Sequence, residues 1–174
     1  MNEKTVKDSQ VIVSQVMQPA DANPAGNVHG GTIMKLIDNA AGVVAFRHSR
    51  RNSVTASVDQ IDFHFPAFIG DLLIIKASLN LVGKTSMEIG ARVESENLIT
   101  GKTRHIASAY LTFVALDDNH KPCAVPGLIF ETDEEEERNC AAQIRRKHRL
   151  GVLVKMIIRR QMFETKAGPH VIRQ

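Results

Sequence analysis

The hydrophobic pattern between residues 32 and 47 predicts one long helix. Apolar residues recur there at the spacings of one face of an α-helix, at Ile33, Leu36, Ile37, Ala40, Ala41 and Val44. They fall within a stripe about 140° wide. Much of the remaining circumference is also apolar, through Met34, Val43, Ala45 and Phe46. A helix that is apolar on most sides should be surrounded by other elements rather than laid on a surface.

From residue 52 onward the pattern changes to an alternation of polar and apolar positions, which predicts β-strands. We expect strands at 11–17, from 54 onward, at 72–82, around 86–93 and at 103–116. The apolar positions change phase at Ile61 and Phe63, which indicates a bulge near Gln60. The connections at 83–85 and 97–102 are short enough for hairpins, so neighbouring strands should be antiparallel. One long helix against one antiparallel sheet is an α+β fold.

Length and composition are those of a single globular domain. The chain has 174 residues, of which 43% are hydrophobic and 24% are charged, as is ordinary for such proteins. Cys123 and Cys140 lie 17 positions apart with no CxxC pair, which excludes a zinc ribbon and a disulfide-dense scaffold. No apolar run approaches the ~20 residues that span a bilayer, and the N-terminus has no apolar signal region. We therefore expect a cytoplasmic protein with no membrane partner.

The net charge of +3 conceals a separation of charge along the chain. Residues 1–137 hold 12 basic and 18 acidic side chains, a net charge of −6, whereas residues 138–174 hold 10 basic side chains and one acid, a net charge of +9. Because the body is acidic and the chain has no Trp and one Tyr, we expect no nucleic-acid partner. The basic C-terminal segment still leaves open a module that binds RNA or a membrane through it.

The glycine pair Gly30-Gly31 at the start of the predicted helix is one candidate for chemistry. Backbone N–H groups at a helix N-terminus have no partner within the helix and lie at the positive end of its dipole. Such a place can hold an anion or a developing oxyanion. The alternative is that the two glycines only allow a tight turn.

Asp38 lies at the edge of the apolar stripe, beside Met34 and Ala41. An ionised carboxylate in an apolar setting is costly unless it is paired or used, although a solvent-facing or salt-bridged aspartate is the alternative. About two helical turns, roughly 10–11 Å, separate Asp38 from the glycines. A site that uses both features would therefore combine two protomers.

The loop before the helix offers two further candidates. His29 could be a base, a donor to a substrate or only a loop residue, and Asn23 could be a cap or turn residue. Motifs of other enzyme classes are absent: there is no GxSxG or GxGxxG, and Ser78 stands where a phosphate-binding loop ending at Lys84 needs Gly. The seven histidines have no metal-ligand spacing, so we expect no metal site.

Taken together, these residues resemble the hotdog-fold acyl-CoA thioesterases, namely the cytosolic acyl-CoA hydrolases and their single-domain bacterial relatives. The motifs that carry the resemblance are Asn23, the run 26–31, Met34, Asp38, Ala41, the segments 83–87 and 111–117, Lys121-Pro122 and Val125-Pro126. They cover about residues 8–149, which we expect to form one hotdog domain of about five to six strands, followed by a basic tail at 150–174.

The resemblance implies hydrolysis of fatty acyl-CoA to a free acid and CoA, with no cofactor besides the CoA of the substrate. It implies homodimers whose sheets join edge to edge, assembled as trimers of dimers. By the same resemblance, Asn23 and Asp38 are a catalytic pair from opposite protomers, with His29 beside them. The N–H of Gly30 or Gly31 would hold the thioester oxygen. Asp38 would deprotonate a water molecule or attack the thioester itself.

CoA carries three phosphates, so cations are expected where it binds. The candidates for CoA binding are Ser57, the hairpin residues Gly83, Lys84, Thr85 and Ser86, and the basic residues Arg145, Arg146 and Lys147. The alternatives for the basic residues are a solvated face, or ion pairs with the acids at 134–137 that hold a C-terminal helix in place.

Two other functions fit a domain of this kind. It could bind acyl-CoA without hydrolysing it, as a ligand-sensing regulator does, although the roughly ten residues before the first strand are too few for a helix-turn-helix. A dehydratase of the same fold, which usually places a histidine and an acid near the helix, stays open through His29.

Overall fold

The structure is a computed structural model that describes residues 2–166, with the side chains of 2–152 and 154–156. Its larger elements are β2 (Val11–Val16), α1 (Gly30–Ser49), β3 (Asn52–Phe63), β4 (Leu72–Val82), β5 (Ser86–Asn97), β6 (Lys102–Leu116) and α2 (Asp133–Lys166). The shorter ones are β1 (Lys4–Thr5), the 3-10 turn η1 (Pro19–Asp21) and β7 (Leu128–Ile129). The order of one strand, one long helix and four strands is the order expected from the sequence.

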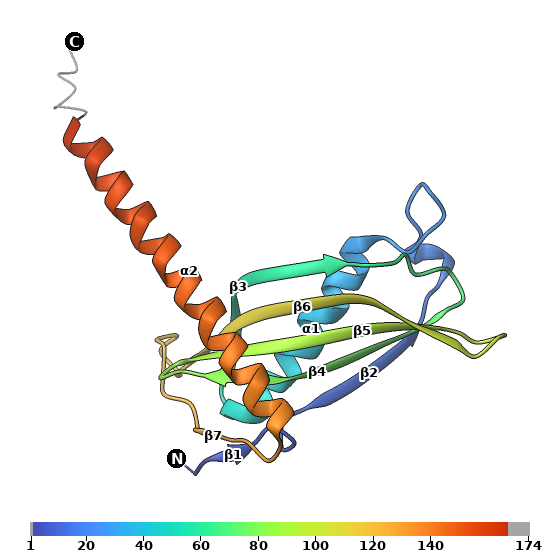
Figure 1. Cartoon of the computed structure of the whole chain (residues 1–174), viewed down its shortest axis with the longest axis horizontal. Coiled ribbons are helices and arrows are strands. Elements are labelled where there is room, and N and C mark those ends of the chain that lie inside the picture. The colour runs from blue at the N-terminus through green and yellow to red at the C-terminus, as the bar shows by residue number, and fades with distance from the viewer. Residues whose placement is uncertain (1, 167–174) are drawn as a thin grey trace.

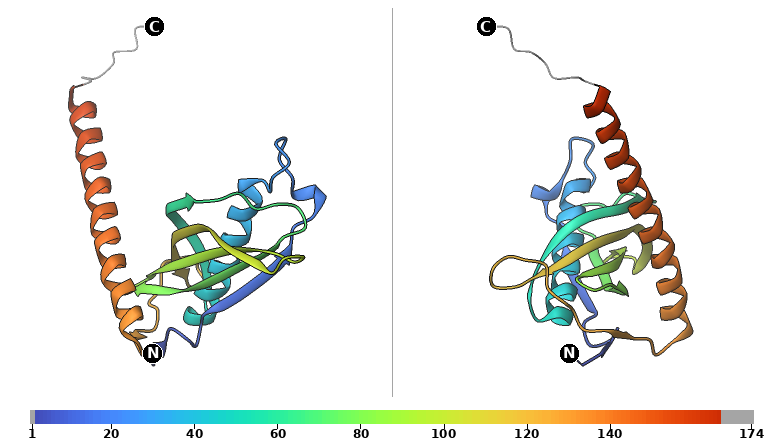
Figure 2. Two further views of the ribbon diagram at one scale, coloured as in Figure 1. Left: turned by 45° about the vertical axis from the view of Figure 1, so that its right-hand side comes forward. Right: turned by 90° about the vertical axis from the view of Figure 1, so that its left-hand side faces the viewer.

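Five strands form one antiparallel sheet in the order β2-β4-β5-β6-β3, while β1 and β7 form a small parallel pair (Figure 1). The expected hairpins at 83–85 and 97–102 join β4 to β5 and β5 to β6. The two long helices lie on opposite faces of the sheet (Figures 1 and 2). This arrangement confirms the α+β fold, and β2 and β3 are its edge strands.

α1 packs its apolar stripe on one face of the sheet and forms the core there. Its buried apolar side chains are Ile33, Ile37, Ala40, Ala41, Val44 and Ala45, and they meet inward-facing residues of β4, β5 and β6. The sides of the helix that do not face the sheet expose 44% of Met34, 39% of Val43 and 47% of Phe46. Within one chain the five-stranded sheet therefore covers the apolar stripe of the helix and leaves these side chains uncovered.

The bulge expected in the strand after residue 52 is present, and it is double. The register of β3 against β6 shifts between Thr55 and Ser57 and again between Val58 and Gln60. Because directly opposed residues share a face of a sheet, Thr55, opposite Phe113, points to the face that carries α1. Ser57 lies opposite Thr112 and points to the other face. The first bulge thus sends two hydroxyls of one strand to opposite sides.

α2 crosses the outer face of the sheet and then continues away from the body of the molecule (Figure 2). Its own Ala142 is fully buried, and the helix packs mainly against β4. It passes position 150 without a break, so the tail proposed to begin there is the second half of a helix that starts at Asp133. Within the part of the chain that is described, no helix is long and apolar enough to cross a membrane.

Candidate active site

A tight loop that contains Asn23 leads the chain into α1. Gly26 adopts a left-handed backbone conformation (φ 84°) that glycine tolerates without strain, and its N–H donates to the carbonyl of Asn23 at 2.9 Å. The Oδ1 of Asn23 accepts hydrogen bonds from the N–H groups of Ala25 at 2.9 Å and Asn27 at 3.2 Å. This is the turn role that the sequence left open, and it engages the carbonyl side of the amide.

His29 caps the N-terminus of α1. Its Nδ1 accepts the N–H of Gly31 at 2.8 Å, so in this state the ring proton lies on Nε2. A Cβ on Gly31 would lie 3.0 Å from that Nδ1, which explains the glycine beneath the ring. The N–H of Gly30 has no acceptor among the described residues. Of the two glycines proposed as donors, Gly30 therefore has the available N–H.

Asp38 lies two turns further along α1, partly exposed, on the side that faces β3. Its Oδ1 accepts a hydrogen bond from the hydroxyl of Thr55 at 2.7 Å. The carboxylate is thus oriented by a neutral donor and takes part in no ion pair of the described chain. The salt-bridged alternative for Asp38 does not hold in this structure.

Asp38 and the helix N-terminus do not meet within one chain. α1 is continuous from Gly30 to Ser49, so Gly31 and Asp38 are separated by about 10–11 Å along its axis. A thioester carbonyl held at Gly30 is out of reach of the Asp38 of the same chain. The geometry that the sequence suggested, with a site assembled from two protomers, is therefore the one compatible with this helix.

The surface next to Asp38 is apolar and belongs to an unpaired edge strand. β3 ends the sheet, and the exposed apolar side chains on its α1-facing side and on the side of α1 next to Asp38 are Met34, Val58 and Phe63. Exposed apolar side chains beside an open strand edge are typical of a protein–protein interface.

The hairpin proposed for CoA binding lies at the other end of the sheet. The loop before α1 contacts Phe68 next to the start of β4, whereas Gly83 follows the end of β4. A strand of 11 residues spans about 33 Å. The hairpin and the start of α1 of one chain thus cannot line one small site, but they could do so across two chains.

The structure brings Arg146 of α2 to this hairpin. A Cβ on Gly83 would lie 2.8 Å from the guanidinium of Arg146 and 3.0 Å from the hydroxyl of Ser86. Lys84 is exposed at the tip of the turn. The guanidinium of Arg146 and the hydroxyl of Ser86 therefore lie together at the hairpin that carries Lys84. We call Lys84, Arg146 and the hydroxyls of Thr85 and Ser86 the cationic cluster, and such groups have the chemistry that a phosphate needs.

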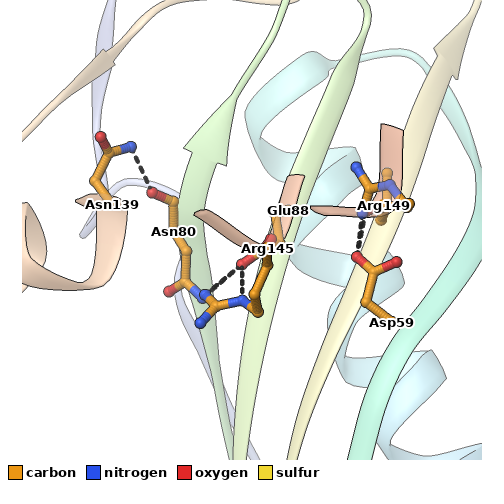
Figure 3. A network of polar contacts seen from close by, with 7 residues as sticks. Asp59, Asn80, Glu88, Asn139, Arg145 and Arg149 are labelled. Carbon is orange, nitrogen blue, oxygen red and sulfur yellow. Dashed lines mark hydrogen bonds and ion pairs between the residues drawn. The ribbon is translucent and has the colours of Figure 1, made fainter. Parts of the chain in front are cut away.

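Arg145 is engaged elsewhere, on the outer face of the sheet (Figure 3). Its guanidinium pairs with Oε1 of Glu88 at 2.6 Å and lies 3.7 Å from the centre of the Tyr110 ring. Only 2% of the Glu88 side chain is exposed. The suggested pairing of Arg145 with the acids at 134–137 is thus wrong, because a buried carboxylate of β5 takes its place.

Ser57 also lies on the outer face, away from Asp38. Its hydroxyl donates to Oδ1 of Asp59 at 2.8 Å, and Asp59 pairs with Arg149 of α2. Its proposed contact with CoA stays a prediction. No group of three metal-ligating side chains gathers anywhere in the described residues.

Comparison with known proteins shows the family to which the chain belongs. A model of the thioesterase superfamily matches residues 25–102, the stretch from the loop before α1 to the start of β6. The uncharacterized acyl-CoA thioester hydrolase YkhA of Bacillus subtilis is 41% identical over 129 residues, which are 74% of this chain and 75% of that one. The chain belongs to the thioesterase superfamily. It is also 40% identical to the rat cytosolic acyl coenzyme A thioester hydrolase, but it spans only 36% of that relative.

Solved thioesterase structures match the fold over nearly their whole length. An apo hexameric acyl-CoA thioesterase superposes with a TM-score of 0.85 at 34% identity, over 88% of this chain and 98% of that one. An acyl-CoA hydrolase of Staphylococcus aureus, solved with butyryl-CoA and CoA, superposes with a TM-score of 0.82 at 34% identity, over 95% and 99%. These matches confirm the hotdog fold that the motifs implied.

Three further structures of the S. aureus hydrolase point to a residue that the sequence reasoning missed. They carry alanine in place of one asparagine, one aspartate and one threonine. The aspartate follows the asparagine by 15 residues, and the threonine follows the aspartate by 17. Asn23, Asp38 and Thr55 stand at the same intervals. Thr55 is a polar residue on an alternating strand, and only its hydrogen bond to Asp38 distinguishes it from its neighbours.

Proposed function

We propose that the protein is an acyl-CoA thioesterase that hydrolyses fatty acyl-CoA to a free fatty acid and CoA. The observation that carries the proposal is the 2.7 Å hydrogen bond from Thr55 to Asp38 on a partly exposed side of α1. It fixes one carboxylate oxygen and leaves the other with no hydrogen-bond donor among the described residues. A carboxylate held in this way is suited to taking a proton from water.

In the proposed reaction, Asp38 accepts a proton from a water molecule while the water oxygen attacks the thioester carbon. The carbonyl oxygen becomes an oxyanion, which the N–H of Gly30 and the dipole of α1 stabilise. When the oxyanion collapses, the C–S bond breaks and CoA leaves as a thiolate that takes up a proton. The acid and CoA are then the only products. These steps use water, a carboxylate and backbone N–H groups, and we propose that no cofactor is needed.

Two protomers build each site in this proposal. Asp38 and Thr55 come from one chain, and Gly30 and Asn23 come from its partner. The open edge of β3, with its apolar flank on α1, is the surface where the two sheets would join. Since Oδ1 of Asn23 is held within its own loop, its NH₂ group is the part that can donate to the water or the carbonyl.

His29 supports the site in this proposal without touching the reacting atoms. It holds the N–H of Gly31, and this fixes the first turn of α1 so that the N–H of Gly30 points outward. The cationic cluster of Lys84 and Arg146 would hold the phosphates of CoA beside the hydroxyls of Thr85 and Ser86. The similarity to a hexameric thioesterase supports assembly as a trimer of dimers, and the cytosolic relative supports a cytoplasmic location.

The test is the release of free thiol from a series of acyl-CoAs of increasing chain length. We expect steady turnover by the wild-type protein and loss of turnover with retained CoA binding in Asp38→Asn. Binding of acyl-CoA by the wild-type protein without thiol release would instead identify a non-catalytic acyl-CoA-binding protein. Release of water from a hydroxyacyl-CoA without loss of the thiol would identify a dehydratase.

A further inference from the structure

The two sides of α2 have different roles. One side is fixed to the outer face of the sheet by three polar contacts: Asn139 to the carbonyl of Asn80 at 2.8 Å, Arg145 to Glu88, and Arg149 to Asp59 (Figure 3). These residues recur at spacings of four and six and share one face of the helix. The other side has no contact with the body and points away from it.

The outward side of α2 is a continuous stripe at spacings of three and four. It consists of Asp133, Glu136, Glu137, Cys140, Ile144, Lys147, His148, Gly151 and Lys155, all of them exposed. The acids occupy its first part and the bases its second part. None of these charged residues takes part in an ion pair of the described chain. On the inward side, by contrast, Arg145 and Arg149 are paired with acids of the sheet.

Between the two charged ends the stripe is apolar and narrow. Ile144 exposes 71% of its surface. A small residue, Cys140, lies one turn before it, and a second, Gly151, lies two turns after it, beyond Lys147 and His148. Ile144, Gly151 and their neighbours on this face border a shallow hollow of about 300 Å³. Small residues beside an apolar one allow two helices to approach closely.

We propose that this stripe binds the same stripe of a second copy, so that two α2 helices lie antiparallel with their Ile144 side chains at the crossing. In that register Asp133 of one helix faces Lys155 of the other, and Glu137 faces Gly151 next to His148. The pair overlaps from 133 to 155, a length of about 33 Å. The contact is two-fold symmetric, because each helix offers the same two halves.

Charge selects the antiparallel direction. A parallel pair would set acids against acids and bases against bases, whereas the antiparallel pair sets Asp133 of each helix against Lys155 of the other. Exposed ion pairs contribute little each, so Ile144 supplies the binding and the charges supply the register. The site lies on the face of the sheet opposite α1, so the contact can join dimers that are formed through β3.

The partner is a second copy rather than a lipid surface because the stripe is divided by sign. A helix that lies on an anionic membrane carries bases along its whole polar face, and three acids at the start of this stripe would be repelled. A relative whose chain this one matches almost end to end is hexameric, which requires contacts between dimers.

The first test is the mass of the intact protein by sedimentation. Ile144→Asp should weaken the association of dimers at least tenfold and leave the dimer, while Ile99→Asp is the control because Ile99 is 93% exposed on a distant hairpin. Asp133→Lys and Lys155→Glu should each weaken the association, and the two together in one chain should restore it. A larger assembly that is unchanged by Ile144→Asp would overturn the proposal.

The second test traps the register. His148→Cys places a thiol opposite the exposed, free Cys140 of the second copy. Oxidised glutathione, which takes up the two electrons, should then link two chains covalently, and Cys140→Ser in addition should abolish the link. If the assembly is intact and no covalent link forms, the proposed register is wrong.

A third experiment measures binding of the wild-type protein to phosphatidylglycerol vesicles. Binding that is lost in Ile144→Asp, with no change in the mass of the assembly, would assign the stripe to membranes. None of these experiments measures hydrolysis, so the proposed function can stand or fail separately.

Discussion

Asp38 and Thr55 illustrate how one hydrogen bond defines a reactive group at the scale of the residue. Asp38 comes from a helix and Thr55 from an edge strand, and the side chain of Thr55 reaches the carboxylate because the first bulge of β3 follows Thr55 rather than preceding it. Because Oδ1 of Asp38 is held by Thr55, the orientation of Oδ2 is fixed as well. The pair is therefore more informative about function than either residue alone.

We expect Asp38→Asn to keep the fold and to lower kcat about 10²–10⁴-fold, the usual contribution of a general base. The amide keeps the shape of the side chain and its contact with Thr55 but cannot accept the proton of water. Circular dichroism and sedimentation check that the assembly is intact, and thiol release gives kcat. Turnover like that of the wild-type protein would remove Asp38 from the mechanism.

Thr55→Val should lower kcat about tenfold or more, because a hydrogen bond to a charged group contributes about 1.5–3 kcal/mol. The methyl group replaces the hydroxyl at the same volume, so KM and stability should change little. Thr55→Ser should recover most of kcat, and Thr103→Val, on an exposed part of β6, is the control. Equal kcat in Thr55→Val and the wild-type protein would show that Asp38 needs no orienting donor.

At the scale of the element, the sequence specified the helix and strands well and the site less well. α1 and the strands were predictable because their burial imposes periods of 3.6 and 2 on the apolar residues. The bulge was visible as a change of phase, but which side of the sheet Ser57 and Thr55 face depends on its position to within one residue. The pairing of Arg145 with Glu88 joins residues 57 apart, which no local pattern indicates.

The cluster at the β4–β5 hairpin makes a prediction about substrate binding. Lys84→Ala with Arg146→Ala should raise KM for acyl-CoA about tenfold and leave kcat at saturation nearly unchanged, since the phosphates are the same in substrate and transition state. The effect should shrink at high salt and vanish for thioesters without the nucleotide. The control is Lys7→Ala with Lys102→Ala, which removes two positive charges at exposed positions away from the hairpin cluster. An equal rise of KM in that control would mean a general charge effect.

Arg145 is left out of this test because it is paired with the buried Glu88 of β5. Removing one partner of a buried ion pair costs about 3–5 kcal/mol, so Arg145→Ala would loosen α2 from the sheet together with any effect on CoA. A lower thermal stability in Arg145→Ala, with little change in Arg146→Ala, is the pattern that separates the anchor from the phosphate contact.

The end of α1 makes the stability depend on pH. His48 is fully buried, its Nε2 donates to the carbonyl of Pro126 at 2.9 Å, and its Nδ1 has no partner among the described residues. Burial lowers the pKa of His48 below its usual 6.5. The unfolded chain therefore binds a proton at a higher pH than the folded chain does. The contribution of His48 to the free energy of unfolding is therefore fully present above about pH 6.5. Below that pH the free energy of unfolding falls, by at most about 1.4 kcal/mol per pH unit.

Urea unfolding at pH 7.5, 6.5 and 5.5 measures this dependence. His48→Gln keeps a donor toward Pro126 but does not titrate, so its midpoint should fall less between pH 6.5 and 5.5 than that of the wild-type protein. His120→Asn, at an exposed turn, is the control. Parallel curves for wild type and His48→Gln would show that His48 does not carry the effect.

At the scale of the whole molecule, a single chain leaves three surfaces without a partner among the described residues. α1 leaves one of its sides uncovered, β3 is an open edge, and the outward stripe of α2 is self-complementary in charge. The three features lie on different parts of the chain and would be satisfied by two different contacts. One contact, at β3 and α1, would complete the active site, and the other, at α2, would join the resulting dimers without entering it.

Mixing two inactive variants tests the division of the active site between chains. In the proposed arrangement every site takes Asn23 from one chain and Asp38 from the other, so Asn23→Ala and Asp38→Asn should each damage both sites of their own dimer. In a mixed dimer one site carries both substitutions and the other carries neither. Random mixing makes half of the dimers mixed, so about a quarter of all sites, and of the wild-type activity, should return. Co-expression with two affinity tags isolates the mixed species. An isolated mixed dimer with no more activity than its parents would place both residues of each site on one chain, which the continuous helix between Gly31 and Asp38 argues against.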